Sequence, residues 1–275
     1  MTRYQLTVEA EKLSRVSALR MGAPYAVVTV SGGPRDGEVL GETEVSDTLD
    51  PRWIKVIYVD TDPSVYLPIN VEIFDQQDGR ENRKMEEASF EVTSINESKA
   101  HTVYEELKGG TIIRATVVES LQGSLMPDAA VKLQFRLLDV KNIESGFLGL
   151  GRTDPFIEVQ KKNVDLDAGI IQWIPVYRTE HVDDNLNPVF KAFQTTAEEL
   201  CYGDPEWPLR LVLYDWQRKG KHREMGVYET CASLANLQAN VATGGNADRE
   251  SALPVDKKDI TTALIIVLKA EVSVG

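Results

Sequence analysis

The sequence has 275 residues, of which 42% are hydrophobic and 27% charged, so it can build one or two compact domains. Its formal net charge of −13 argues against nucleic-acid binding, because contacts to phosphates need a basic face. Two cysteines, Cys201 and Cys231, are too few for a disulfide framework, and we expect free thiols. The apolar runs have the length of strands and the first residues are charged, so we expect neither a membrane span nor a secretory signal.

The predicted elements, taken in chain order, are short strands between turn residues. Alternating or β-branched runs predict strands in the first half at 4–10, 25–31, 53–59, 67–75, 89–95 and 111–119. Periodicity stops at 121–128, where Gly123, Ser124 and Pro127 indicate a domain boundary. Strands resume at 130–140, 155–162, 173–182, 189–195, 209–215 and 263–272. Short helices are expected at 197–200 and 232–238, and a polar loop at 240–250. The fold class is therefore all-β, with domains at 1–122 and 123–275.

Three short strings occur twice in the same order, which indicates an internal repeat. GAPYAVV at 22–28 matches RTDPFIEV at 152–159, TLDPRW at 48–53 matches NLNPVF at 185–190, and EIFDQQDG at 72–79 matches VLYDWQRKG at 212–220. Pro24 and Pro155 are 131 residues apart, while Asp75 and Asp215 are 140 residues apart. Slowly growing separations predict one ancestral unit with small loop insertions in its second copy.

The repeated strings resemble the SDPY, TLNPxW and xxYD signatures of the C2 domain. The resemblance implies two tandem eight-stranded antiparallel β-sandwiches that dock at phospholipid membranes, with the first copy more diverged. The second copy is similar to the second C2 domain of copines, through VYRTEHVDDNLNPVFKAF and ELCYGDPEWPLRLVLYD. Copines carry a further integrin-like domain, for which these residues contain no counterpart, so its role is not carried over. Trp53 and Phe190 follow the Asx-Pro turns and are expected in the cores.

The resemblance also implies five loop positions that hold calcium in family members. By spacing they fall near Ser17, Ala23, Asp75, Gln77 and Arg83 in the first copy, and near Leu148, Asp154, Asp215, Gln217 and Arg223 in the second. Calcium takes 6–8 oxygen ligands, and only Asp75, Asp154 and Asp215 keep a carboxylate. An arginine about 4 Å from a cation costs on the order of 4 kcal/mol at an effective dielectric near 20. We therefore expect vestigial positions, no resident calcium and no other cofactor, with Asp154 and Asp215 paired to arginines or loop amides.

Two loops of the second copy combine apolar and basic residues that suit an anionic membrane. The first loop presents Phe147, Leu148 and Leu150 among glycines, and the loop after Asp215 presents Arg218, Lys219, Lys221, His222 and Arg223. Each basic residue near an anionic surface contributes about 1 kcal/mol, and each buried apolar side chain roughly 1.5–3 kcal/mol. Two alternatives remain open: the apolar residues could instead cap the sandwich, or the loops could bind an acidic protein partner.

The pattern predicts no enzyme. His101, His181 and His222 are scattered without metal-ligand spacing, the glycines of 146–151 lack the lysine of a phosphate loop, and neither cysteine has a neighbouring histidine. The expected function is a calcium-independent phospholipid-binding adaptor, cytoplasmic and peripheral to membranes. The alternatives are a protein-interaction scaffold with degenerate C2 domains and, third, calcium-dependent phospholipid binding.

Overall fold

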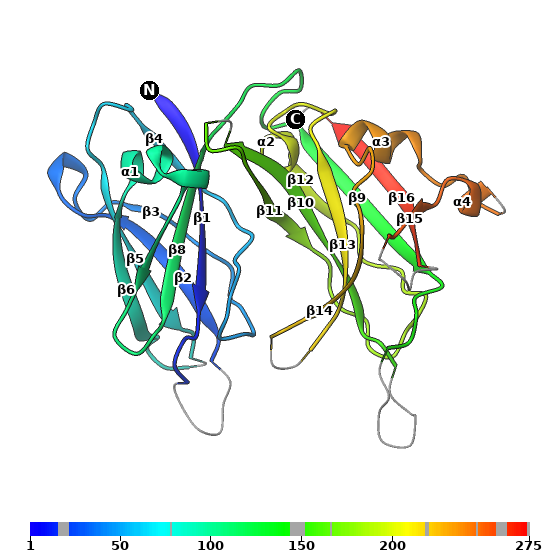
Figure 1. Ribbon diagram of the computed structural model, residues 1–275, viewed down its shortest axis with the longest axis horizontal. Coiled ribbons are helices and arrows are strands. Elements are labelled where there is room, and N and C mark those ends of the chain that lie inside the picture. The colour runs from blue at the N-terminus through cyan, green and yellow to red at the C-terminus, as the bar shows by residue number, and fades with distance from the viewer. Residues whose placement is uncertain are drawn as a thin grey trace. The chain divides into compact units, whose positions relative to one another are not determined.

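The computed structural model describes residues 1–15, 22–77, 79–143, 152–165, 167–217, 220–245, 247–256 and 263–273 (Figure 1). The chain divides into two compact units, Met1–Ser120 with Asn163–Gln172, and Leu121–Lys162 with Trp173–Gly275. In the described ranges, 16 strands form four antiparallel sheets of four strands each. None of the helices in these ranges is long and apolar enough to cross a membrane. The prediction of two eight-stranded sandwiches is confirmed.

The first sandwich packs the sheet β4-β1-β8-β7 against the sheet β3-β2-β5-β6. Its strands are β1 (Thr2–Glu11), β2 (Pro24–Val30), β3 (Val39–Glu42), β4 (Ile57–Thr61), β5 (Pro68–Asp75), β6 (Arg83–Glu91), β7 (Thr102–Glu106) and β8 (Ile112–Glu119). Its helical segments are α1 (Val92–Glu97) and two 3-10 turns, Gly33–Arg35 and Lys99–His101. In β2 and β5, buried residues alternate with partly exposed ones, which places one face of each strand in the core.

The second sandwich packs the sheet β12-β9-β16-β15 against the sheet β11-β10-β13-β14. Its strands are β9 (Ala130–Leu138), β10 (Pro155–Asp165), β11 (Ile170–Arg178), β12 (Phe193–Thr196), β13 (Leu209–Asp215), β14 (Arg223–Tyr228), β15 (Leu253–Pro254) and β16 (Leu264–Ser273). Its helices are α2 (Ala197–Cys201), α3 (Leu234–Ala239) and α4 (Ala247–Glu250). The predicted helices near 197–200 and 232–238 are therefore confirmed, while α4 occupies the end of the segment predicted as a loop.

Each sandwich has its own hydrophobic core, and the aromatic residues of the repeated strings lie in it. Trp53 and Phe190 are each 1% exposed and belong to the two separate clusters. The Trp53 indole donates to the backbone oxygen of Pro24 at 3.3 Å, so its one polar atom is satisfied. These residues stabilise the cores, as their position after the Asx-Pro turns predicts.

The repeat extends to individual hydrogen bonds at the loops. The backbone N–H of Lys12 donates to Oδ1 of Asp50 at 2.7 Å, and that of Asp139 donates to Oδ1 of Asn187 at 2.9 Å. Both donors adopt a left-handed backbone, with φ of 59° and 57°. The threonines Thr43 and Thr179 likewise accept the backbone N–H of an inward-facing β residue at 2.9 Å. Equivalent bonds at equivalent positions confirm two copies of one fold.

One predicted strand is wrong in its second half. Residues 89–91 end β6, but Val92–Glu97 forms α1 instead of continuing the strand. The Glu91 side chain causes this change, since it accepts the backbone N–H groups of Thr93 and Ser94 and so caps the new helix. The strands β3, β7, β14 and β15 were not predicted, because they are short and carry few apolar residues on one face.

Candidate functional site

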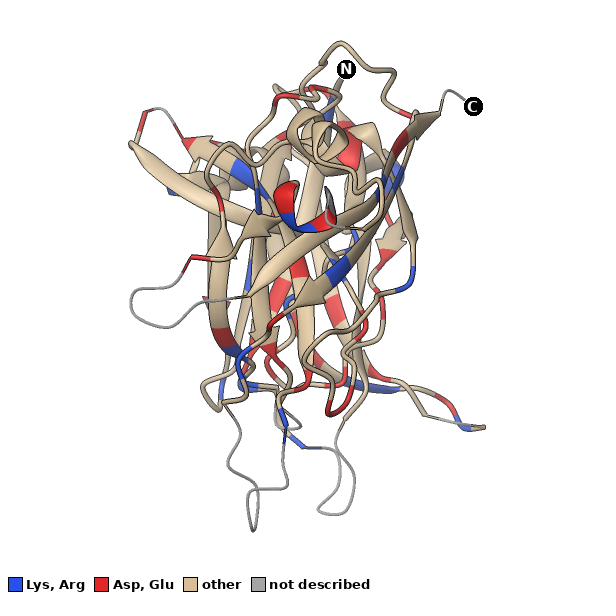
Figure 2. Ribbon diagram, turned by 90° about the vertical axis from the view of Figure 1, so that its right-hand side faces the viewer, with Lys and Arg blue, Asp and Glu red and all other residues tan. Residues whose placement is uncertain are grey.

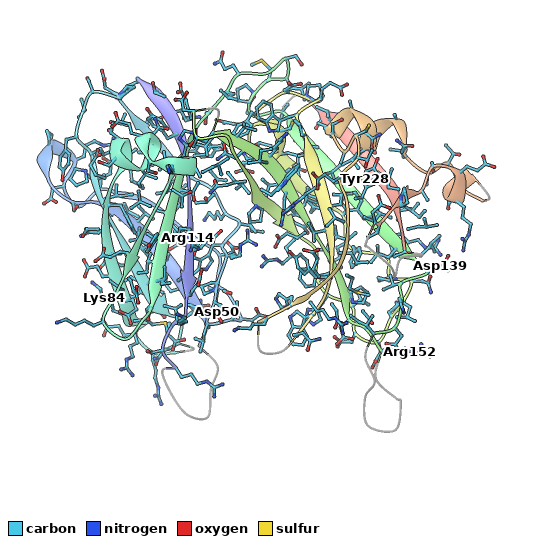
Figure 3. The ribbon with its side chains drawn as sticks, viewed as in Figure 1. Asp50, Lys84, Arg114, Asp139, Arg152 and Tyr228 are labelled. Carbon is cyan, nitrogen blue, oxygen red and sulfur yellow. The ribbon has the colours of Figure 1, made fainter. Side chains whose placement is uncertain are left out.

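Three loops meet at one end of the second sandwich. They join β9 to β10, β11 to β12, and β13 to β14, and we call their described residues the tip: 139–143, 152–154, 179–192, 216–217 and 220–223. Pro155 pairs with Asp215, and Asp215 pairs with Arg223, so the first and third loops begin and end side by side. Val182 donates to the backbone oxygen of Pro155 at 3.3 Å and brings in the second loop. In Figure 3, Arg152 lies at this end of the sandwich.

Two of the three predicted aspartates hold the loops of the tip together. Asp215 is 1% exposed, and its Oδ1 accepts the backbone N–H of Asp154 at 3.0 Å. Its Oδ2 accepts the side-chain amide of Gln217 at 2.7 Å. The Oδ1 of Asp154 in turn accepts the backbone N–H of Asp184 at 2.7 Å. The expectation that Asp154 and Asp215 pair with loop amides is therefore confirmed.

Burial raises the pKa of Asp215 above its ordinary value, although the hydrogen bonds from Asp154 and Gln217 act in the opposite direction. The Asp154 carboxylate adds to the increase, and the Arg223 charge opposes it. A carboxyl group that burial disfavours as an anion, and whose oxygens already accept two hydrogen bonds, is a poor ligand for a strongly hydrated cation.

The described carboxylates do not fit a resident calcium ion. Within the described residues, no group of three or more His, Cys, Asp or Glu side chains could hold a metal ion. Gln77 and Arg83, and Gln217 and Arg223, stand at positions where the family pattern has carboxylates. In the first sandwich, Oδ1 of the buried Asp75 accepts the backbone N–H of Ala23 at 2.7 Å. The expected positions at Ser17 and Leu148 lie outside the described residues.

An aromatic cluster lies beside the aspartates, and the sequence analysis did not predict it. Trp216 stacks on His181 with ring centroids 4.3 Å apart and an interplanar angle of 10°. His222 packs edge-on against Phe156 at 5.0 Å, and its Nδ1 accepts the backbone N–H of Gln217 at 3.1 Å. Two of the three histidines that look scattered in the sequence therefore flank one tryptophan. The signal that was present is the position of Trp216 directly after the buried Asp215.

Exposed cations from the first, second and third loops accompany this cluster. They are Lys141, Arg152, Lys191, Lys221 and Arg223. The second loop also carries Glu180, Asp183 and Asp184, of which Asp183 lies 3.4 Å from Nε2 of His181. Basic and acidic residues are interspersed over both sandwiches (Figure 2), so positive charge at the tip is local. Lys221 and Arg223 lie where the third loop was predicted, whereas Phe147, Leu148, Leu150, Arg218 and Lys219 lie outside the described residues.

The C2 domain family model matches residues 5–107 and 123–243. The chain is similar to Copine-A of Dictyostelium discoideum, with 26% identity over 250 residues that make up 88% of this chain and 39% of Copine-A. The chain thus spans less than half the length of that relative. It is similar to the solved structure of BON1-C2B, at 20% identity and a TM-score of 0.42, covering 54% of this chain and 94% of that one. A calcium-bound pair of C2 domains from Extended-Synaptotagmin 2 covers 98% of this chain, which covers 97% of that pair, at 12% identity and a TM-score of 0.34.

Proposed function

Because the chain belongs to the C2 domain family and carries two such domains in tandem, we propose that it is a non-enzymatic adaptor that docks at anionic phospholipid membranes. Docking takes place through the tip of the second sandwich and needs no calcium. The observation that carries this proposal is the division of labour at the tip. Asp154 and Asp215 are used inside the protein, while Lys221 and Arg223 face solvent beside Trp216.

The attraction to the membrane combines two physical contributions. Each basic residue near an anionic surface supplies about 1 kcal/mol, and this contribution falls off within a Debye length. Trp216 is half-buried, and tryptophan favours the boundary between headgroups and acyl chains. The apolar residues Phe147, Leu148 and Leu150, and the cations Arg218 and Lys219, belong to the same proposed surface. The overall charge of −13 opposes binding only weakly, because distant charges are screened.

Calcium independence follows in this proposal from the absence of repulsion that calcium would have to neutralise. In a calcium-dependent site, clustered carboxylates repel an anionic membrane until the ion binds. At this tip the carboxylates of Asp154 and Asp215 accept amide protons, and Arg223 stands opposite Asp215 in the β13–β14 pairing. The cationic loop therefore faces the membrane with its charge already present.

A protein-interaction scaffold is the second candidate, and the first sandwich favours it. The cation Lys84 there lies 2.5 Å from Glu72 and 2.6 Å from Glu87, so its charge is balanced locally. Buried carboxylate and paired cations at this end offer little attraction to an anionic surface. In the adaptor proposal the first sandwich is accordingly free for a protein partner while the second one docks. We place such an adaptor in the cytoplasm, at the inner face of membranes.

Co-sedimentation with vesicles tests the proposal. We expect the full chain to sediment with phosphatidylserine- or phosphoinositide-containing vesicles in the presence of a chelator, and not with phosphatidylcholine vesicles. Binding should weaken as salt rises, because the cations supply the long-range attraction. The adaptor proposal fails if anionic vesicles do not bind the protein even at low salt, and the scaffold then takes its place. Binding that appears only after calcium is added supports the third alternative, calcium-dependent docking.

A further inference from the structure

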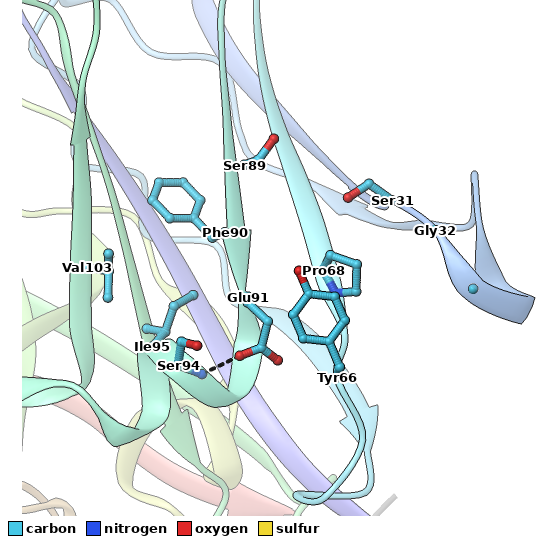
Figure 4. A pocket seen from close by; sticks show the side chains of 11 residues that line it. Ser31, Gly32, Tyr66, Pro68, Ser89, Phe90, Glu91, Ser94, Ile95 and Val103 are labelled. Atoms are coloured by element: carbon cyan, nitrogen blue, oxygen red, sulfur yellow. Dashed lines mark hydrogen bonds between the residues drawn. The ribbon is translucent and has the colours of Figure 1, made fainter.

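A pocket of about 650 Å³ opens on the first sandwich, away from any residue used so far. Its apolar lining comes from Pro68, Phe90, Ile95 and Val103, and Tyr66 stands at its mouth with 73% of its surface exposed. Figure 4 shows Phe90, Ile95 and Val103 on one side of the pocket and Tyr66 and Pro68 on the other. An aromatic side chain so exposed beside an apolar hollow is more typical of a recognition surface than of a core.

The pocket lies where two sheet edges come together. Phe90 belongs to β6 and Val103 to β7, and each of these strands is the last in its sheet. An edge strand leaves backbone groups open on one side, so an incoming segment can lie along it. The hydroxyl groups of Ser89 and Ser94, on exposed residues that line the pocket, add polar atoms at the rim.

The electrostatic surroundings of the pocket are acidic. The carboxylate of Glu91, which lines it, accepts the backbone N–H groups of Leu67 at 3.2 Å, Thr93 at 3.1 Å and Ser94 at 2.5 Å. Burial works against ionisation of Glu91, but these hydrogen bonds outweigh it and lower its pKa, so the group is an anion at neutral pH. Lysine and arginine are missing from the lining residues, all of which the structure describes.

Two further carboxylates are held at the rim by bonds to lining residues. Oδ1 of Asp36 accepts the backbone N–H of Gly32 at 2.6 Å, and Oε2 of Glu105 accepts that of Ser89 at 3.3 Å. With Glu91, they surround an apolar hollow with negative charge from three different elements. An anionic lipid headgroup or an acidic peptide would be repelled by this arrangement, whereas a cation beside an apolar group would be attracted.

We propose that this pocket binds a segment of a partner protein in which a large apolar side chain is flanked by lysine or arginine. The apolar side chain enters between Tyr66 and Phe90, and the flanking cations face Glu91, Asp36 and Glu105. This surface is separate from the tip of the second sandwich and gives the adaptor a second, oppositely charged ligand. The inference stands whether or not the protein binds membranes, because it uses none of the residues of the tip.

The experiment titrates the full 275-residue chain with a synthetic peptide in which tryptophan is flanked on each side by two lysines. Methyl resonances of Ile95 and Val103 report on the pocket by NMR. We expect saturable shifts at these methyl groups that weaken with salt. A peptide with serine in place of tryptophan, and one with glutamate in place of lysine, should each bind about tenfold more weakly or not at all.

Variants separate binding from folding. Tyr66→Ala should weaken peptide binding about tenfold, and Ser94→Trp should abolish it by filling the hollow. Tyr104→Ala is the matched control, since Tyr104 is an exposed tyrosine (62%) of the same sandwich that does not line the pocket, and it should bind normally. Equal binding of the serine peptide, or normal binding by Tyr66→Ala, overturns the proposal. Shifts of the Ile95 and Val103 methyl groups by short-chain phosphatidylserine but not by the lysine peptide would also overturn it.

Discussion

The backbone N–H of Asp154 donates to Oδ1 of Asp215 at 3.0 Å, and this bond ties the loop before β10 to the end of β13. Ala23 and Asp75 form the same bond at 2.7 Å in the first sandwich. The aspartate has survived in both copies, although a carboxylate at residue 23 has not. An internal role as acceptor for a loop amide explains why this carboxylate is useful even where no ion is bound.

The first prediction concerns calcium. We expect the melting temperature of the protein to stay unchanged when about 100 µM calcium is added, because selective binding to the folded state would raise it by mass action. Differential scanning calorimetry of the full chain in chelator and in calcium measures this. An increase that disappears in Asp154→Asn or Asp215→Asn, which preserve an acceptor for the loop amide, would show that these aspartates do hold the ion.

The second prediction concerns Lys161, a lysine of β10 that is 1% exposed. Its Nζ donates to the backbone oxygen of Glu199 at 2.9 Å and lies 3.9 Å from the centre of the Tyr202 ring. Burial lowers its pKa from 10.5 to about 7, against the opposing attraction of nearby acidic groups. Between these two values the unfolded chain binds more protons than the folded protein, so the free energy of unfolding rises with pH through this window.

Lys161→Met removes this titration and keeps a side chain of similar length. We expect the parent protein to gain stability relative to the variant as the pH rises from about 7 to about 9. Urea unfolding of both proteins at several pH values measures the difference, which cancels the titration of all other groups. If the two stability curves run parallel, Lys161 keeps an ordinary pKa and the burial argument is wrong.

The third prediction concerns Gly123, where the chain enters the second sandwich. Its N–H donates to the backbone oxygen of Tyr202 at 2.9 Å, and Leu125 donates to that of Gly203 at 2.8 Å. A Cβ atom at residue 123 would lie 2.1 Å from the carbonyl carbon of Gly203, which is backbone and cannot swing aside. We expect Gly123→Ala to lower the free energy of unfolding by about 1–3 kcal/mol, in the range of overpacked sites. The neighbouring Ser124→Ala should stay within about 0.5 kcal/mol in the same denaturant titration.

The long strands of the fold could be predicted because their residues alternate along nearly the whole element. Residues 209–215 form β13 as expected, and the runs at 25–31 and 67–75 differ from β2 and β5 by one residue at the ends. The short edge strand β14 could not be predicted in this way, because one of its residues, Gly226, has no side chain to alternate. A Cβ there would lie 2.6 Å from Val255, so the glycine reflects a tertiary contact that the local pattern does not contain.

The candidate site divides along similar lines. Asp154 and Asp215 could be predicted as neighbours, since matching strings place each at a strand end that the sandwich brings together. The stacking of Trp216 on His181 could not, because it joins two loops whose conformations depend on Asp154, Asp184 and the strands between them. The pocket beside Tyr66 was also not predicted, as it forms between strands of opposite sheets.

The fourth prediction reverses the charge of the third loop. Lys219→Glu with Lys221→Glu should remove most binding to phosphatidylserine vesicles at low salt, because two attractive contributions of about 1 kcal/mol each become repulsive. Lys99→Glu with Lys132→Glu is the matched control, since it changes the net charge equally at exposed residues outside the tip. Equal loss of co-sedimentation in both variants would mean that net charge, rather than the loop, governs binding.

The fifth prediction concerns Phe147 and Leu148 in the first loop. Phe147→Ser with Leu148→Ser should reduce the part of vesicle binding that survives high salt, because apolar burial does not depend on screening. The lysine reversals should instead reduce the part that salt removes, so the two double variants differ in the slope of binding against salt concentration. Exposed loop changes usually alter stability by no more than about 0.5 kcal/mol, so the melting temperature should stay near that of the parent. A sharp drop in melting temperature would identify these side chains as part of the core, and the apolar contribution to docking would then have to come from Trp216.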